Sequence, residues 1–302
     1  TKSDEENIEL KLNIPMINYN PKDWFTFIFH IHKADTFRKL WPLMLSVAVF
    51  SGIISFLELH VFRLSKSDYV SNIGMMHSLL GFVISMLLVF RTNTSYDRWW
   101  DGRKLLGALT NVSRNFAMKI KALKLSEEDS KFFEYGIPKY AFALKEHLRE
   151  RKYFGKDSFL IEVKKDKHIP NQVASSMISK LYELAAKGFV SQEQLIVLTN
   201  DVNQFTDICG GCERIKNTPI PFSYSVFIKK FIFIYVLTIP IGWVFSLGYY
   251  LVLIVPFILY VLASLELIAE EIEDPFGEDA NDLPVDTICN NIEKHVEEIL
   301  RK

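Results

Sequence analysis

Two cysteines in this sequence have a spacing that chemistry often uses. Cys209-Gly-Gly-Cys212 matches the spacing of a redox or zinc motif. It falls in a stretch with helical periodicity and lacks the strand that precedes a thioredoxin site, and no His or Cys pair nearby supplies two further zinc ligands. We therefore expect Cys209 and Cys212 to pack, with their two glycines, against a neighbouring helix.

A second group of residues with chemical potential is acidic and lies at 270–282. Asp274, Glu278, Asp279 and Asp282 surround a Pro-Phe-Gly turn and could offer the oxygen ligands that calcium prefers. Their spacing does not match an EF-hand loop. From the residues alone, a solvated acidic turn that caps a helix is the favoured alternative.

A single histidine lies inside an apolar run. His77 is an ionisable residue at a depth where a membrane would penalise charge, which makes it a functional candidate or a side chain hydrogen-bonded to a neighbour. No Ser/His/Asp set, P-loop or dinucleotide glycine pattern is visible. We expect no enzyme, no catalytic residue and no required cofactor.

Composition indicates a membrane protein with a sizeable water-facing part. Of 302 residues, 49% are hydrophobic and 24% are charged, and 24 are Phe. A net charge of -1 excludes a strongly basic nucleic-acid binder, and three Cys favour a reducing compartment over a disulfide scaffold. Residues 1–20 show no signal-peptide pattern, so we expect insertion to use the internal apolar segments.

The chain divides into five predicted segments. Residues 1–39 form a cytoplasmic N-terminal segment with an interfacial helix at 21–32, for which a buried packing segment is the alternative. Residues 40–90 form a transmembrane hairpin, because 40–57 and 70–90 carry no charged side chain and the loop around Lys66 is short. The second span continues without a turn residue into Arg91, so we expect one unbroken helix there.

The remaining segments are a cytoplasmic helical region at 91–218, spans three and four at 219–268, and an acidic turn with a C-terminal helix at 269–302. Amphipathic pieces are predicted at 132–153, 173–188 and 192–215, with loops at 126–129 and 155–171. Lys and Arg flank both ends of the first hairpin, which predicts four spans with both termini in the cytoplasm. The spans offer no convincing pair of charges.

Three motifs in this order resemble the bestrophin family in its bacterial form: FRTNTSYDRWWDGR at 90–103, NTPIPFSY at 217–224 and EDPFGEDANDLP at 273–284. The resemblance spans about 20–290. It implies an all-α fold with four transmembrane helices and a cytoplasmic helical bundle, assembled as a homopentamer around a central pore. In the family the second span lines a hydrophobic neck, and a second constriction lies at the base of a cytoplasmic vestibule.

The resemblance places the neck on one face of the second span. Met75, Leu79, Phe82 and Met86 share that face by helical spacing, and Val83 or Ser78 are alternatives to Phe82 because the spacing to Arg91 is one residue longer than in animal members. An apolar neck gates ions by dewetting. Without the family, packing against lipid or protein would be the favoured explanation.

The resemblance also suggests a cytoplasmic aperture and a calcium site. The aperture residues are Glu193, Ile196 and Val197, where five carboxylates would favour cations, although an exposed Glu at a helix start is the plainer interpretation. Animal members bind calcium at the position of Asp274, Glu278, Asp279 and Asp282, so calcium binding is chemically feasible here.

The expected function is therefore a bestrophin-like channel in the bacterial inner membrane that passes small inorganic ions, with chloride-type anions slightly favoured. A monovalent cation channel for Na⁺ or K⁺ is the alternative within the family. A membrane-anchored scaffold or a carrier is the alternative from another class, and a carrier should show paired charges within its spans.

Overall fold

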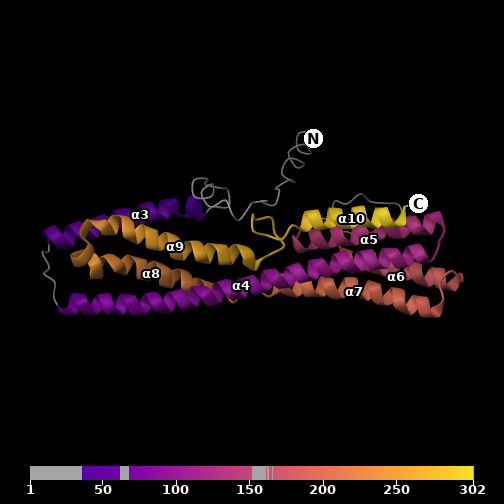
Figure 1. The fold of residues 1–302 in the computed structure, drawn as a ribbon, viewed down its shortest axis with the longest axis horizontal. Coiled ribbons are helices and arrows are strands. Elements are labelled where there is room, and N and C mark those ends of the chain that lie inside the picture. The colour runs from indigo at the N-terminus through magenta and orange to yellow at the C-terminus, as the bar shows by residue number, and fades with distance from the viewer. Residues whose placement is uncertain (1–35, 62–67, 152–160, 162, 165, 302) are drawn as a thin grey trace, which may run out of the picture. The chain divides into compact units, whose positions relative to one another are not determined.

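The fold is helical throughout the part of the chain that the structure describes. The computed structural model describes residues 36–61, 68–151, 161, 163–164 and 166–301. Every regular element in these ranges is a helix (Figure 1). This confirms the all-α prediction. The interfacial helix expected at 21–32 and the loop around Lys66 lie outside the described residues.

The helices coincide with the predicted helical segments, and several of them are longer than predicted. In chain order they are α3 (Thr36–Phe56), the π-helical η1 (Leu57–Val61), α4 (Asp68–Ala122), α5 (Glu127–Leu148), α6 (Ile169–Ala186), α7 (Gln192–Asn217), α8 (Phe222–Leu247), the 3₁₀ turn η2 (Gly248–Tyr250), α9 (Leu251–Glu273) and α10 (Val285–Leu300). The unbroken helix expected across Phe90 and Arg91 is confirmed, because α4 runs through both residues and contains no Pro.

The chain forms two compact units. Among the described residues, unit 1 comprises those from Thr36 to Arg98, Pro219–Glu273 and Asp279–Asn281, and unit 2 comprises those from Trp99 to Thr218, Asp274–Glu278 and those from Asp282 to Arg301. Helix α4 contributes its first part to unit 1 and its last part to unit 2.

Unit 1 is an apolar helical layer. Helices α3, α8 and α9 pack on one another, and the first part of α4 adds Ile84 and Leu88 to their shared core. Within the described ranges, three helical stretches are long and apolar enough to cross a membrane: Thr36–Val61, Ile73–Ala122 and Phe222–Glu273. The third stretch contains both α8 and α9, with η2 between them and Gly248 at a φ of 54°.

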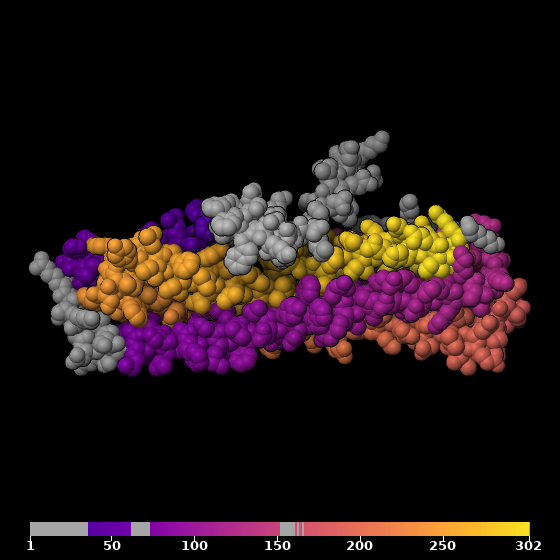
Figure 2. All heavy atoms as spheres, viewed as in Figure 1, coloured from indigo at the N-terminus to yellow at the C-terminus, as the bar shows by residue number. Residues whose placement is uncertain are grey.

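Unit 2 is a bundle of α5, α6, α7 and α10 around the last part of α4. Phe116 of α4 is fully buried and meets Phe133 and Phe205 edge to face, at centroid distances of 5.7 and 6.1 Å. Helix α10 packs along α5, and Figure 2 shows its yellow side chains at the surface of this bundle. Its buried residues recur every three or four positions, as an amphipathic helix requires.

Helix ends in unit 2 correct the predicted loops. Residues 126–129 are not a loop, because Ser126 caps α5 by accepting the Asp129 backbone N–H, and three acidic residues fill the first turn. The loop expected up to Asn171 ends earlier, since His168 caps α6. The predicted start of α7 is confirmed by a capping box between Ser191 and Gln194.

Candidate functional site

The candidate pore-lining residues share one exposed face of α4. The exposed fractions are 67% for Met75, 63% for Leu79, 65% for Phe82, 45% for Val83 and 44% for Met86. Ser78, the other alternative, is also exposed. This apolar stripe is open in the single chain, and its place on a pore axis stays a prediction.

The opposite face of α4 is buried and holds the helix in unit 1. Ile84 and Leu88 are each 1% exposed and pack with apolar residues of α8 and α9. His77 lies on this buried face, where its Nε2 is 3.0 Å from the Thr238 hydroxyl and its Nδ1 is 3.0 Å from the Ile73 carbonyl oxygen. Both ring nitrogens of His77 are thus occupied by protein partners.

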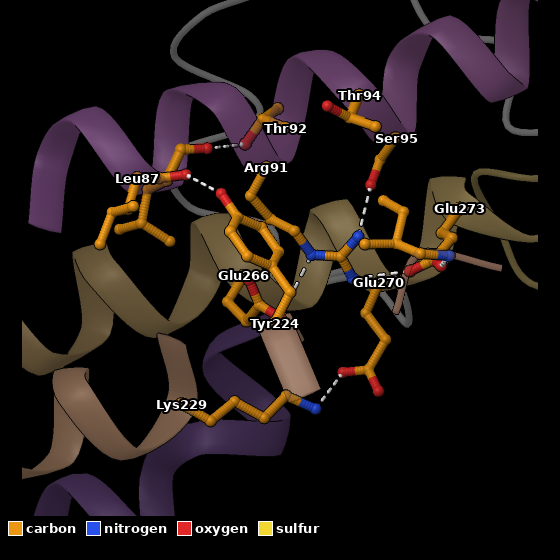
Figure 3. A network of polar contacts seen from close by, with 12 residues as sticks. Leu87, Arg91, Thr92, Thr94, Ser95, Tyr224, Lys229, Glu266, Glu270 and Glu273 are labelled. Atoms are coloured by element: carbon orange, nitrogen blue, oxygen red, sulfur yellow. Dashed lines mark hydrogen bonds and ion pairs between the residues drawn. The ribbon is translucent and has the colours of Figure 1, made fainter. Parts of the chain in front are cut away.

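A buried guanidinium anchors α4 where its apolar run ends. Arg91 is 1% exposed, and its Nη2 donates to Glu273 Oε2 at 2.7 Å while its Nη1 donates to Ser95 Oγ at 3.0 Å (Figure 3). Its Nε lies 3.5 Å from Glu266 Oε1. Both carboxylates belong to α9, so a single side chain ties two helices of unit 1 together.

Glu273 is the hub of this network. Its Oε1 accepts the Ile220 backbone N–H at 2.6 Å, and its own carbonyl oxygen accepts from Arg98 Nε at 3.0 Å. Arg91 follows the expected hairpin at 40–90, so its pairing with Glu266 and Glu273 does not contradict the expectation that the spans offer no convincing pair of charges. Of the two carboxylates, Glu273 is the last residue of α9 and Glu266 lies seven residues before it.

A further pair in unit 1 involves a lysine of the predicted third span. Lys229 Nζ lies 2.8 Å from Glu270 Oε2, and both side chains are about half exposed (Figure 3). Lys229 therefore faces a protein carboxylate. Such an exposed pair contributes little to stability.

The acidic turn already has basic partners. Asp274 Oδ2 lies 2.7 Å from Lys216 Nζ, and Glu278 pairs with Arg149 and Arg151. A Cβ on Gly277 would come within 2.7 Å of Asp282 Oδ2, so a larger residue at 277 would require that carboxylate to move. Asp279 belongs to unit 1, whereas the other three candidate ligands belong to unit 2. Calcium binding stays a prediction.

Arg149 shapes the Pro-Phe-Gly turn. It is 5% exposed at the side chain, its Nε donates to the Phe276 carbonyl oxygen at 3.2 Å and its Nη2 donates to that of Gly277 at 3.1 Å. The same Nη2 lies 2.8 Å from Asp286 Oδ2. Burial raises the pKa of the Asp286 carboxyl, but hydrogen bonds from Arg149 and Lys145 outweigh it and lower that pKa below its ordinary value.

We expect Arg149→Met to lower the free energy of unfolding by about 2 to 4 kcal/mol, because it leaves a half-buried carboxylate and two carbonyls short of donors. Thermal unfolding of the purified protein measures the loss. Arg151→Met is the matched control: its side chain is 42% exposed and pairs with Glu278, so the expected loss is below about 1 kcal/mol. Equal losses in the two variants would contradict this role of Arg149.

The candidate aperture residues lie in the first two turns of α7. Ile196 is 70% exposed and Val197 is 50% exposed. Glu193 accepts the Ser191 hydroxyl at 2.6 Å, and this hydrogen bond, with one to the backbone, lowers the pKa of its carboxyl. The helix-start role considered for Glu193 is thus present in the structure, and its part in an aperture stays a prediction.

The cysteine motif is confirmed as packing. Cys209 and Cys212 are free thiols, 2% and 0% exposed, and a Cβ on Gly211 would come within 2.9 Å of Leu105. Burial raises the pKa of both thiols to about 12, so they stay protonated at neutral pH.

The residue that follows the motif takes part in a group that the sequence analysis missed. Glu213 Oε1 lies 2.7 Å from Nε2 of His147 and 2.7 Å from Nε2 of His168. His147 belongs to α5, His168 is the N-cap residue of α6, and Glu213 belongs to α7. No short spacing pattern could have revealed them.

Comparisons with known proteins identify the family of this chain. The family described as Bacterial/Fungal Bestrophin protein matches residues 16–298. A voltage-dependent anion channel-forming protein of Nostoc sp. is 31% identical over 294 residues, which is 92% of each chain. The voltage-dependent anion channel-forming protein YneE of Escherichia coli (strain K12) is 32% identical over 222 residues, or 72% of this chain and 73% of YneE.

A solved structure shares the fold. The crystal structure of a bacterial bestrophin homolog from Klebsiella pneumoniae superposes with a TM-score of 0.75 at 25% identity, covering 86% of this chain and 96% of that one. The match over nearly the whole sequence, together with the apolar helices of unit 1, shows that this chain is a membrane protein of the bestrophin family.

Proposed function

We propose that this chain forms a homopentameric channel that conducts small anions of the chloride type across the bacterial inner membrane. The observation that carries the proposal is the exposed apolar stripe of α4 at Met75, Leu79, Phe82 and Met86. Five copies of this face around an axis would form a dry neck, where the cost of dehydrating an ion controls conduction.

The proposal includes four spans with both termini in the cytoplasm. Helices α8 and α9 pack on each other and contain 26 and 23 residues, each enough to cross the roughly 30 Å of hydrocarbon. If α8 and α9 each cross the membrane once, then these two helices, α3 and the apolar part of α4 give four crossings in total.

The anion preference rests on relatives whose names describe anion channel-forming proteins. A monovalent cation channel for Na⁺ or K⁺ remains the second candidate on ion type, and these names give it no support. A carboxylate ring at Glu193 would be the feature in its favour, because Glu193 is exposed and carries a lowered pKa.

A scaffold or carrier is the candidate from another class. A carrier needs charged or discontinuous helices near the membrane centre. The buried ion pairs of Arg91 connect helix ends instead, with Glu273 as the last residue of α9. This position suits a structural anchor better than a substrate site.

Reconstitution in planar bilayers tests the proposal. We expect unitary currents whose reversal potential follows the chloride gradient when potassium chloride is unequal on the two sides. Reversal at the potassium potential would replace the anion channel by the cation channel. Absence of current from a verified assembly in lipid would favour the scaffold or carrier.

Calcium at the acidic turn is a separate part of the proposal. No cofactor is needed for conduction, but calcium binding would use Asp274, Glu278, Asp279 and Asp282, after Asp274 leaves Lys216 and Glu278 leaves its two arginines. We expect a higher melting temperature in calcium than in chelator, lost in Asp282→Asn. Equal melting temperatures for the wild type would remove calcium from the proposal.

A further inference from the structure

Three side chains in unit 2 form a compact group of nitrogen and oxygen ligands. His147 stands at the end of α5, His168 caps α6, and Glu213 lies on α7 after the buried cysteines. One ligand atom from each lies within 4.8 Å of the other two, and the two imidazole centroids are 4.3 Å apart. Among the described residues this is the group that gathers three such ligand atoms.

Two neutral imidazoles and one carboxylate match the ligand set of an open zinc site. Zinc takes His nitrogen and Glu oxygen at about 2.0 to 2.2 Å and leaves its fourth position to water. The three side chains are 35%, 30% and 30% exposed, so an ion can reach them and keep that water. We propose that His147, His168 and Glu213 bind one zinc ion per chain and thereby clip α5, α6 and α7 together.

The present geometry requires a defined rearrangement when the ion enters. His168 Nδ1 accepts the Asn171 backbone N–H at 3.2 Å, so its proton lies on Nε2 and is donated to Glu213. Zinc takes the Nε2 lone pair, and the ring proton moves to Nδ1. The Asn171 bond is then lost, and the ligand atoms separate from 2.7 Å to about 3.3 Å, as tetrahedral coordination demands.

The buried thiols of Cys209 and Cys212 do not take part, because both side chains lie in the core of unit 2, whereas about a third of the Glu213 side chain is exposed. The site therefore differs from the zinc motif that the cysteine spacing first suggests. It also lies in a different unit from the candidate neck residues.

The test uses the full-length assembly purified in detergent, first stripped with chelator. We expect one zinc per chain by metal analysis after dialysis, a melting temperature that rises in zinc, and loss of both effects in Glu213→Gln and His147→Ala. Glu183→Gln is the matched control, since Glu183 is a comparably exposed carboxylate of α6 that pairs with lysines. Wild-type and variant assemblies with equal zinc content would overturn the site.

Cobalt gives a measurement on the wild type that does not depend on the folding of variants. We expect the intense visible absorption of four-coordinate Co²⁺ with nitrogen ligands, displaced by added Zn²⁺. The faint spectrum of six-coordinate Co²⁺ would overturn the proposal. Neither experiment measures current, so failure here leaves the channel proposal standing, and a silent channel leaves the zinc site standing.

Discussion

Replacing Arg91 by Met is expected to lower the free energy of unfolding by about 3 to 5 kcal/mol, because Glu266 and Glu273 lose their buried cation. Arg91 is 1% exposed, and the Glu266 and Glu273 side chains are 3% and 13% exposed. Water cannot replace the guanidinium in such a setting. The melting temperature of the purified protein and the yield of assembled protein measure the loss.

Two companion variants separate charge from packing at this site. Lys229→Met is the matched control, because Lys229 is a cation of the same network whose side chain is 47% exposed. Its removal is expected to lower the free energy of unfolding by less than about 1 kcal/mol. Adding Glu266→Gln and Glu273→Gln to Arg91→Met should recover part of the stability, since no unpaired charge then stays buried. If Arg91→Met melts as the wild type does, Arg91 is not an anchor.

The sequence predicted the helices well where local signals were strong. Uncharged runs and the absence of turn residues predicted α4 across Phe90 and Arg91, and Ser191 predicted the start of α7. The loop predicted at 126–129 was wrong because a Ser followed by acidic residues also describes a cap and a first turn.

The interactions that hold the helices together could not be predicted from one sequence. Arg91 meets Glu266 and Glu273 across 175 and 182 positions, and Glu213 meets His168 and His147 across 45 and 66. Such contacts depend on how helices pack, and no spacing rule reaches that far. The positive charge of Arg91 predicted a membrane boundary but not its burial.

The helical period predicted which face of α4 would be free. Met75, Leu79, Phe82 and Met86 follow steps of three or four residues, and the structure exposes all four. The period cannot distinguish a pore from lipid or a neighbouring subunit. That distinction requires a measurement of current.

Phe82→Ala is expected to raise the unitary conductance severalfold, and Leu79→Ala to act in the same direction. Each removes a large apolar side chain that is more than 60% exposed, which would widen the neck and keep it wet, so that an ion loses less hydration when it passes. Single-channel recordings in planar bilayers, with equal potassium chloride on both sides, measure the change.

Leu253→Ala supplies the control that makes this result specific. Leu253 is 74% exposed on α9, which is also a predicted span but is not expected to line the pore. If exposure alone mattered, all three variants would change the unitary conductance equally. If α4 lines a central passage, only the Phe82 and Leu79 variants change it. Unchanged conductance in both α4 variants would assign their face to lipid or to a subunit contact, because removing bulk from the narrowest part of a dewetted passage must lower its barrier.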